Sequence, residues 1–295
     1  MKKFFYLVPA LTCLFFSCAK NSNSLPGSGT DTTGTGTPIG NYVAYQTKHS
    51  TQLTYAGQAS NTPYDSVSAD FTYDQQSRLL TIITQEWSNA SGTPIVSNVL
   101  TNIAYSRDTV TYSTHLNGDG GVSLQTVFYL NSSTALIDSA VHLVNGGIGV
   151  WYTFEREKYA YSNSYATNAD TTFYNAITGA VTGTSNAVLT WSNGDLLSVS
   201  NKTSAGNTTL TTYSYFSTAP APVVTTESGP LYVKGISLTK DYPQTKTINV
   251  NGNLFQNWAF TFTTNALNQV ISAKWVVTGP AFPDAPFVTT STSYF

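Results

Sequence analysis

From residue 41 onward the sequence is a series of short runs in which apolar and polar residues alternate, each ending at a turn signal. Alternation with a period of two indicates a β-strand with one buried face. Runs such as "SVSADFTYD", "RLLTIITQEW" and "TLTTYSYFS" are separated by turns such as "NASGTP", "NGDGG", "NSST" and "SAGN". Strands that recur about every 8–12 residues predict consecutive hairpins. We therefore expect an all-β antiparallel meander, whose sheet is either open or closed like a barrel.

A weak internal repeat supports this prediction, because four segments share an aromatic-ended strand, a tight turn and an apolar return strand. They are "FTYDQQSRLLTI" (71–82), "FYLNSSTALIDSAV" (128–141), "LTWSNGDLLSV" (189–199) and "FTFTTNALNQVIS" (260–272). The turn residues Asn131, Asn193 and Asn265 tolerate positive φ, which tight hairpins require. By contrast, the segment 217–230 contains three prolines, which cannot donate to a ladder, so it is predicted to be a loop.

Composition excludes some partners. Only 9% of the residues are charged, against about 25% in a typical soluble domain, and the net charge is −2. No basic patch is available to neutralise phosphates, so nucleic acid is excluded as a partner. Hydrophobic residues make up 41% of the chain and aromatic residues 13%, which is enough to build a core. Thr and Tyr are abundant, and both favour pleated, half-buried strands.

The first residues have the form of an export signal. Met1-Lys2-Lys3 is basic, an apolar run reaches Phe16, and Ser17 is a small residue before Cys18. This order is typical of a secretory signal, and the run is shorter than the about 20 residues of a membrane span. A cysteine directly after a small residue resembles a bacterial lipobox. We expect cleavage between Ser17 and Cys18 and lipidation of Cys18; the alternative is an ordinary secretory peptide that ends near a cysteine.

This interpretation divides the chain into three parts. Residues 1–17 form the signal peptide, and residues 18–40 hold the lipidated cysteine and a flexible tether of Gly, Ser, Thr and Pro with a span of about 25 Å. Residues 41–295 form a single β-rich domain. Cys13 is removed with the signal, so the folded domain contains no disulfide, metal thiolate or thiol nucleophile.

Tyr73-Asp74 with Arg78-Leu79 is similar to the Tyr-Asp-x-x-Gly-Arg-Leu repeats of extracellular β-rich proteins, with Ser77 in place of Gly. After this motif come "AYSRDTVTY", "FYLN", "WSNGDLLSV", "TYSYF" and "LNQVISAKW". Their order resembles uncharacterised Bacteroidota lipoproteins that carry a domain of unknown function with a porin-like β fold. The resemblance covers residues 65 to 277. It implies that fold and an outer-membrane location, and it supplies no functional residue.

The sequence offers little catalytic chemistry. His49, His115 and His142 are far apart and have no ligand partners at metal spacing, so they are expected to be ordinary strand residues. Glu155 and Glu157 share one face of a strand and could form the acid–base pair of a glycoside-active enzyme. A solvated face, with Arg156 and Lys158 alternating away from it, is the favoured interpretation. We therefore expect no enzyme activity, no metal and no other cofactor.

Two further groups of candidate sites remain. Among the five tryptophans, Trp151 and Trp191 are candidates for stacking against a ligand. Asp followed by Ser or Thr and then by Ala, Val or Thr resembles the O-glycosylation motif of exported Bacteroidota proteins. The alternative is that strands begin with Asp after a turn and continue with Thr. The candidate hydroxyls belong to Thr32, Ser66, Thr109, Ser139 and Thr171.

The function expected from the sequence is a lipid-anchored, non-enzymatic binding or structural module at the outer membrane, facing either the periplasm or the cell surface. Its ligand would be a glycan or a protein; the alternative is a half-barrel that carries an apolar or lipid ligand. A membrane-spanning barrel is disfavoured, because alternate residues counted back from Phe295 are Ser293, Ser291 and Thr289. They would form a polar face toward the lipid.

Overall fold

The computed structural model describes residues 47–294, except 58, 76–77, 90–94, 117–122, 135, 148–149, 164, 194, 217–241, 268 and 281. The predicted signal peptide, Cys18, the tether, Thr32 and the proline-containing loop therefore lie outside the described residues. Within the described part of the chain, no helix is long and apolar enough to cross a membrane.

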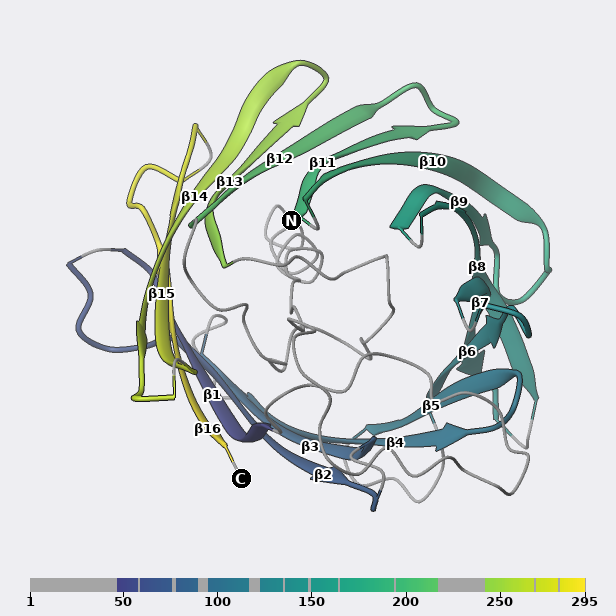
Figure 1. Cartoon of the computed structure of the whole chain (residues 1–295), viewed down its shortest axis with the longest axis horizontal. Helices are drawn as coiled ribbons and strands as arrows, with labels where there is room; N and C mark the ends of the chain where they lie inside the picture. The colour runs from purple at the N-terminus through teal and green to yellow at the C-terminus, as the bar shows by residue number, and fades with distance from the viewer. Residues whose placement is uncertain are drawn as a thin grey trace.

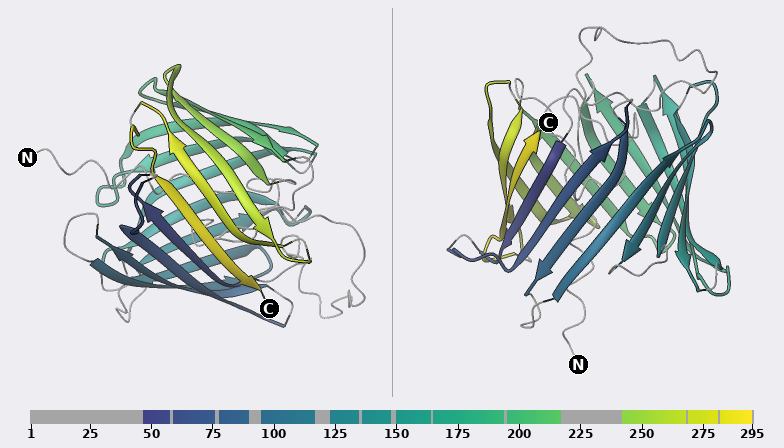
Figure 2. Two further views of the ribbon diagram at one scale, coloured as in Figure 1. Left: turned by 90° about the vertical axis from the view of Figure 1, so that its left-hand side faces the viewer. Right: turned by 90° about the horizontal axis from the view of Figure 1, so that it is seen from below.

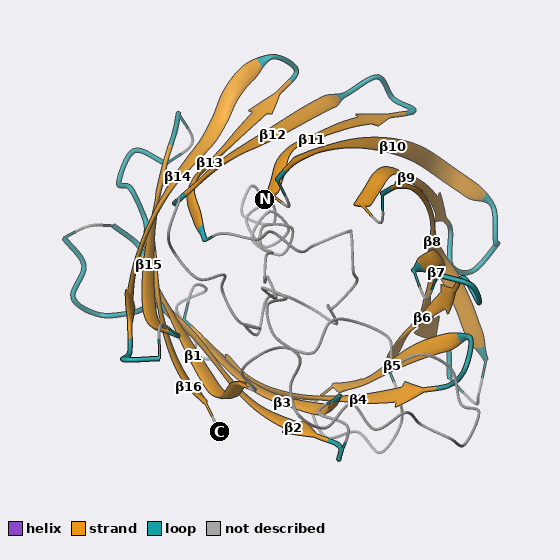
Figure 3. Ribbon diagram, in the orientation of Figure 1, coloured by secondary structure: helices purple, strands orange, loops and turns teal. Residues whose placement is uncertain are grey.

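In the described residues, sixteen strands form one sheet, and each strand pairs antiparallel with the next (Figures 1 and 3). They are β1 (Thr47–Tyr55), β2 (Asp65–Tyr73), β3 (Leu79–Ser88), β4 (Ile95–Tyr105), β5 (Thr109–Leu116), β6 (Leu124–Leu130), β7 (Ile137–Asn145), β8 (Trp151–Ser162), β9 (Tyr165–Tyr174), β10 (Val181–Ser192), β11 (Asp195–Thr203), β12 (Thr208–Tyr215), β13 (Pro243–Val250), β14 (Asn253–Thr264), β15 (Val270–Thr278) and β16 (Phe287–Tyr294). Because β1 also pairs with β16, the sheet closes into a barrel of tilted strands (Figure 2). The predicted meander is confirmed, and the barrel is closed rather than open.

All four repeat segments are hairpins, formed by β2–β3, β6–β7, β10–β11 and β14–β15. Strand direction alternates around the barrel, so every connection from an even-numbered to an odd-numbered strand lies at the same rim. We call this the near rim; β1 begins there, and the opposite end is the far rim. The internal repeat therefore marks one rim of the barrel.

The turns close by two different mechanisms. Asn193 has a φ of 52°, as predicted. The same prediction for Asn131 and Asn265 was wrong, because neither is among the described residues with positive φ. Instead, the Asn265 Oδ1 accepts the backbone N–H groups of Leu267 and Gln269, both at 3.0 Å. Asn131 accepts equivalent bonds from the residues two and three positions on. Short Asn side chains satisfy backbone donors in this way without a left-handed backbone.

The two faces of the barrel wall differ in polarity. The less exposed residues of neighbouring strands lie opposite one another, so they form one continuous surface. The concave side of a barrel crowds its side chains, and we assign this surface to the inside. Buried inward residues include Phe71, Ile103, Tyr112, Phe128, Leu189, Trp258, Phe260 and Trp275. Exposed outward residues include Asp70, Asn98, Arg156, Lys158, Asp170, Asn186, Lys202 and Thr261.

Ser, Thr, Asn and charged residues predominate on the outward face. Apolar residues interrupt it in small groups, such as Ile83 opposite Leu100 on β3 and β4. On β16, Ser293 and Ser291 are exposed on this face, as their register in the sequence suggested. Outer-membrane barrels have an apolar band outside and a polar interior. The polarity of this barrel is the reverse.

The inner wall has two zones. Two apolar clusters, one centred on Phe71 and Phe128 and the other on Leu189 and Leu196, occupy its near-rim half. A third cluster around Trp258 spans most of the height of β13 to β16. Toward the far rim, β3 to β12 carry mainly polar and titratable residues on their inward face, most of them only half-buried.

The assignment of faces predicts different effects for two chemically identical substitutions. Ile103 is 5% exposed on the inner wall, whereas Ile83 is 51% exposed on the outward face. Ile103→Ala should lower the free energy of unfolding by about 2–5 kcal/mol because it leaves a cavity. Ile83→Ala should change it by no more than about 1 kcal/mol. Urea unfolding followed by circular dichroism measures both, and equal losses would contradict the assignment.

Candidate functional site

A cluster of titratable side chains lies on the inner wall where β7 meets β8. His142 on β7 is directly opposite Glu155 on β8, and Ala140 is directly opposite Glu157. Because the alanine side chain is small, Glu157 can reach back toward the imidazole, and His142 Nε2 lies 3.5 Å from Glu157 Oε2. One ligand atom from each of His142, Glu155 and Glu157 falls within 4.8 Å of the other two.

An irregularity in the ladder adjoins this cluster. The β7–β8 register shifts between His142 and Leu143, so that Leu143 is opposite Thr153 and Phe154 is the extra residue. The Phe154 ring lies 6.0 Å from the imidazole ring of His142, measured between centroids. A bulge re-aims the side chains beside it, and bulges are frequent next to functional sites.

Neighbouring hydroxyl groups hold the cluster in place. Thr126 lies opposite His142 on β6, and its Oγ1 is 3.0 Å from His142 Nδ1. The Tyr159 hydroxyl donates a hydrogen bond to Glu157 Oε2. Burial raises the pKa of Tyr159, so this hydroxyl stays protonated and remains a donor. Both ring nitrogens of His142 and one carboxylate oxygen of Glu157 therefore have polar neighbours.

The pKa values of the two glutamates shift in opposite directions. Burial, together with the nearby charge of Glu157, raises the pKa of Glu155. Burial also acts against ionisation of Glu157, but hydrogen bonds from His142 and Tyr159 bring its pKa below the ordinary value. Burial opposes the protonation of His142, yet the hydrogen bond and charge of Glu157 and the charge of Glu155 raise its pKa above 6.5. The cluster can therefore exchange protons or hold a cation.

The prediction that Glu155 and Glu157 lie on a solvated face of the strand is wrong. Arg156 and Lys158 do point away, toward the outside, as the alternation predicted. Glu155 and Glu157 face the interior, and the Glu157 side chain is only 23% exposed. Sequence spacing missed the cluster because His142 is on a different strand. To predict that the three residues lie together, one would have to know the register of the β7–β8 hairpin, including its bulge.

The two tryptophans proposed for ligand stacking are not brought together. Trp191 lies at the near-rim end of β10, where its indole N–H donates to the Ala166 carbonyl at 2.7 Å. Its ring packs 5.0 Å from Tyr165, so this side chain is part of the wall. Trp151 is half-buried at the far-rim end of β8. They share no platform for a ligand.

The described candidate glycosylation residues divide between the two faces. Ser66, Thr109 and Ser139 fall on the outward face in the strand register, whereas Thr171 falls on the inward face. Thr109 Oγ1 is also 2.8 Å from Ser106 Oγ. The outward position leaves three of these hydroxyls on the side where a bulky glycan can be accommodated.

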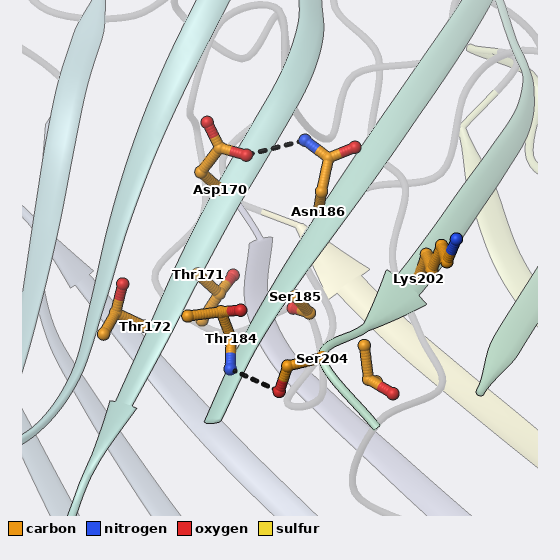
Figure 4. A pocket seen from close by; sticks show the side chains of 9 residues that line it. Asp170, Thr171, Thr172, Thr184, Ser185, Asn186, Lys202 and Ser204 are labelled. Carbon is orange, nitrogen blue, oxygen red and sulfur yellow. Dashed lines mark hydrogen bonds between the residues drawn. The ribbon is translucent and has the colours of Figure 1, made fainter. Parts of the chain in front are cut away.

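A polar groove of about 400 Å³ lies over β9, β10 and β11 and is lined by nine residues, Thr171 among them. In the groove, the Asn186 amide donates to the Asp170 carboxylate at 2.6 Å, and the Thr184 backbone N–H donates to Ser204 Oγ at 3.1 Å (Figure 4). Asp170, Asn186 and Lys202 are exposed at its margin. The groove is open, and these two hydrogen bonds pair four of its nine lining residues with one another.

No model of a known protein family and no curated protein matches the sequence. Among solved structures, the chain is similar to a porin-like protein from Bacteroides uniformis, with a TM-score of 0.55 and 14% identity over 84% of this chain and 96% of that one. A porin-like protein from Bacteroides vulgatus gives a TM-score of 0.55 and 10% identity, over 85% and 99% of the two chains. The fold is therefore a porin-like β-barrel, as the resemblance in the sequence implied. At this identity the likeness concerns the fold alone.

The coupling between His142 and Glu157 can be tested directly. The measurement uses protein freed of metal ions. Glu157→Gln removes a hydrogen bond and a negative charge that both raise the pKa of His142, whereas the burial that lowers this pKa persists. The imidazole should therefore titrate at a lower pH in the variant than in the native protein, as followed by NMR. Glu86→Gln, on a more distant strand, is the control and should leave the titration unchanged. An unchanged midpoint in Glu157→Gln would show that the two groups are not coupled.

Proposed function

We propose that the protein is a lipid-anchored binding barrel of the cell envelope, which stands in water and takes up a polar ligand at the far-rim half of its inner wall. The observation that supports this most strongly is the reversed polarity of the wall. Lys158, Asp170 and Lys202 lie within strands on the outward face. A lysine placed at the middle of a bilayer costs about 2–4 kcal/mol in a barrel. A water-exposed barrel avoids this cost.

Attachment through Cys18 is compatible with the topology of the barrel. β1 begins at the near rim, so the chain that precedes Thr47 joins the barrel there. A tether from an acylated Cys18 would approach from that side and leave the far rim free. The polar inner wall that carries His142, Glu155 and Glu157 is nearest to this free rim. The anchor and the ligand site would thus lie toward opposite ends of the molecule.

The composition of the inner wall favours a polar ligand, such as a glycan or a polar segment of a protein. In the far-rim half, the half-buried inward residues include Thr126, Thr171 and Asn201, in addition to the titratable cluster. Many of the apolar residues of the inner wall are already buried. Trp258, Phe260 and Trp275, for example, are between 5% and 8% exposed. Their number nevertheless supports a second candidate function, a carrier for an apolar or lipid ligand.

The anchor is tested by Cys18→Ala. The acyl chains of a lipoprotein hold it to the membrane because each buried methylene contributes about 0.8 kcal/mol. The variant should therefore move from the membrane fraction to the soluble fraction after cell lysis, without detergent. Ser17→Thr, which retains the cysteine, serves as a comparison for processing. Persistence of the Cys18→Ala protein in the membrane would overturn the proposed anchor.

The two ligand classes can be separated by analysis of what the protein retains. The soluble Cys18→Ala protein would be purified from cells, extracted with organic solvent, and the extract measured by mass spectrometry. A polar binding barrel should yield no lipid at a stoichiometry near one per chain. Recovery of one defined lipid per chain would instead support the apolar carrier.

A further inference from the structure

We propose that His142, Glu155 and Glu157 form a binding site for one divalent transition-metal cation, best matched by Zn²⁺. This inference does not rest on the anchor or on the ligand class proposed above. It rests on four observations: the distances between the donor atoms, the groups that orient them, the charges around them and their access to solvent.

The donor atoms are close to the spacing of a zinc site. Zinc binds nitrogen and oxygen ligands at about 2.0–2.2 Å in a tetrahedron, so its ligand atoms are about 3.3–3.6 Å apart. His142 Nε2 and Glu157 Oε2 are already 3.5 Å apart. The complete set with Glu155 falls within 4.8 Å. Rotation of the Glu155 side chain can shorten its distances while the paired backbones of β7 and β8 stay fixed.

The surrounding hydroxyl groups orient these donors as a metal requires. A histidine ligand usually donates its other ring N–H to an acceptor, which fixes the tautomer. Thr126 Oγ1, 3.0 Å from His142 Nδ1, can accept this hydrogen bond and leave the Nε2 lone pair free for the cation. The Tyr159 hydroxyl donates to Glu157. This hydrogen bond limits the rotation of the carboxylate.

The charges near the cluster are unbalanced. Apart from His142 itself, the inward residues opposite the two glutamates in the strand register are Ala140, Thr171 and Phe173, which are uncharged. Arg156 and Lys158 belong to the same strand but face outward. On the inward face of β7, β8 and β9, no described residue is a lysine or an arginine. Two partly buried carboxylates thus face one imidazole, and a divalent cation would neutralise them.

The ligand set selects among cations. Calcium takes six to eight oxygen ligands, whereas this site supplies one imidazole and two carboxylates. Imidazole is a ligand suited to Zn, Cu, Fe and Ni. Three protein ligands leave a fourth tetrahedral position open, as in zinc sites that bind a water or an exogenous ligand. The His142 and Glu157 side chains are 22% and 23% exposed, so a cation can enter from the interior.

The test is isothermal titration of ZnCl₂ into the mature protein, purified and freed of metal by dialysis against EDTA. We expect one saturable equivalent of Zn²⁺ per chain. His142→Ala and Glu155→Gln should each weaken binding at least about 10-fold. Thr126→Val, which removes only an orienting group, should also weaken it, by about 10–100-fold on the precedent of other zinc sites. Glu86→Gln and His115→Ala are matched controls outside the cluster and should bind like the native protein.

Binding that is absent, unsaturable, or unchanged in all three cluster variants would overturn the proposal. Circular dichroism establishes that each variant retains the β fold. A second measurement needs no variant, because Zn²⁺ added to the native protein should shift the NMR signals of the His142 imidazole and leave those of His115 in place. Perturbation of His115 in preference to His142 would equally refute the site.

Discussion

The pairing of β1 with β16 is the constraint on which the rest of the structure depends. It joins the two ends of the sheet, from Thr47 opposite Tyr294 to Tyr55 opposite Phe287. Closure removes the unpaired strand edges that would otherwise template association. It also gives every strand one concave and one convex face, so that alternate residues experience two different environments. The apolar residues collect on the concave side, where neighbouring strands bring them into contact.

This separation of faces determines what the barrel can do. A wall with a polar exterior gains nothing from lipid contact, whereas its interior can combine an apolar lining with polar groups. In the near-rim half, clusters around Phe71 and Leu189 stabilise the wall. In the far-rim half, the bulge at His142 coincides with the titratable cluster. On β7 and β8, the apolar packing and the candidate chemistry therefore occupy different halves of the same strands.

The hairpins could be predicted from the sequence because they depend on local information. The alternation of apolar residues and the short polar turns identify β2–β3 or β10–β11 without knowledge of any other strand. The Asn193 turn was predicted correctly for the same reason. Closure could not be predicted, since it pairs Thr51 with Ser291 across nearly the whole domain. The turn at Asn265 shows a smaller limit, because an Asn side chain can satisfy a turn in two ways that the sequence does not distinguish.

The candidate site needed more than local information. Alternation along the strand shows that Glu155 and Glu157 share a face and that Arg156 and Lys158 share the other, but it does not show which face is solvated. Which side of the strand lies inside depends on the closed barrel. The partnership with His142 depends on the β7–β8 register, and the neighbouring bulge shifts that register by one residue. A one-residue error in register would place the imidazole on the opposite face.

The most direct test of the reversed polarity is the accessibility of the outward face in the native, lipid-anchored protein. Single cysteines would be introduced at Ser200 and Thr261, which are exposed on the outward faces of β11 and β14, and at Thr178, which lies in an exposed turn. A charged maleimide that does not cross membranes would then be applied to protein reconstituted in vesicles. The account predicts that both strand cysteines react as rapidly as the one at Thr178. Protection of the two strand cysteines by the bilayer, with the turn cysteine still reactive, would contradict it.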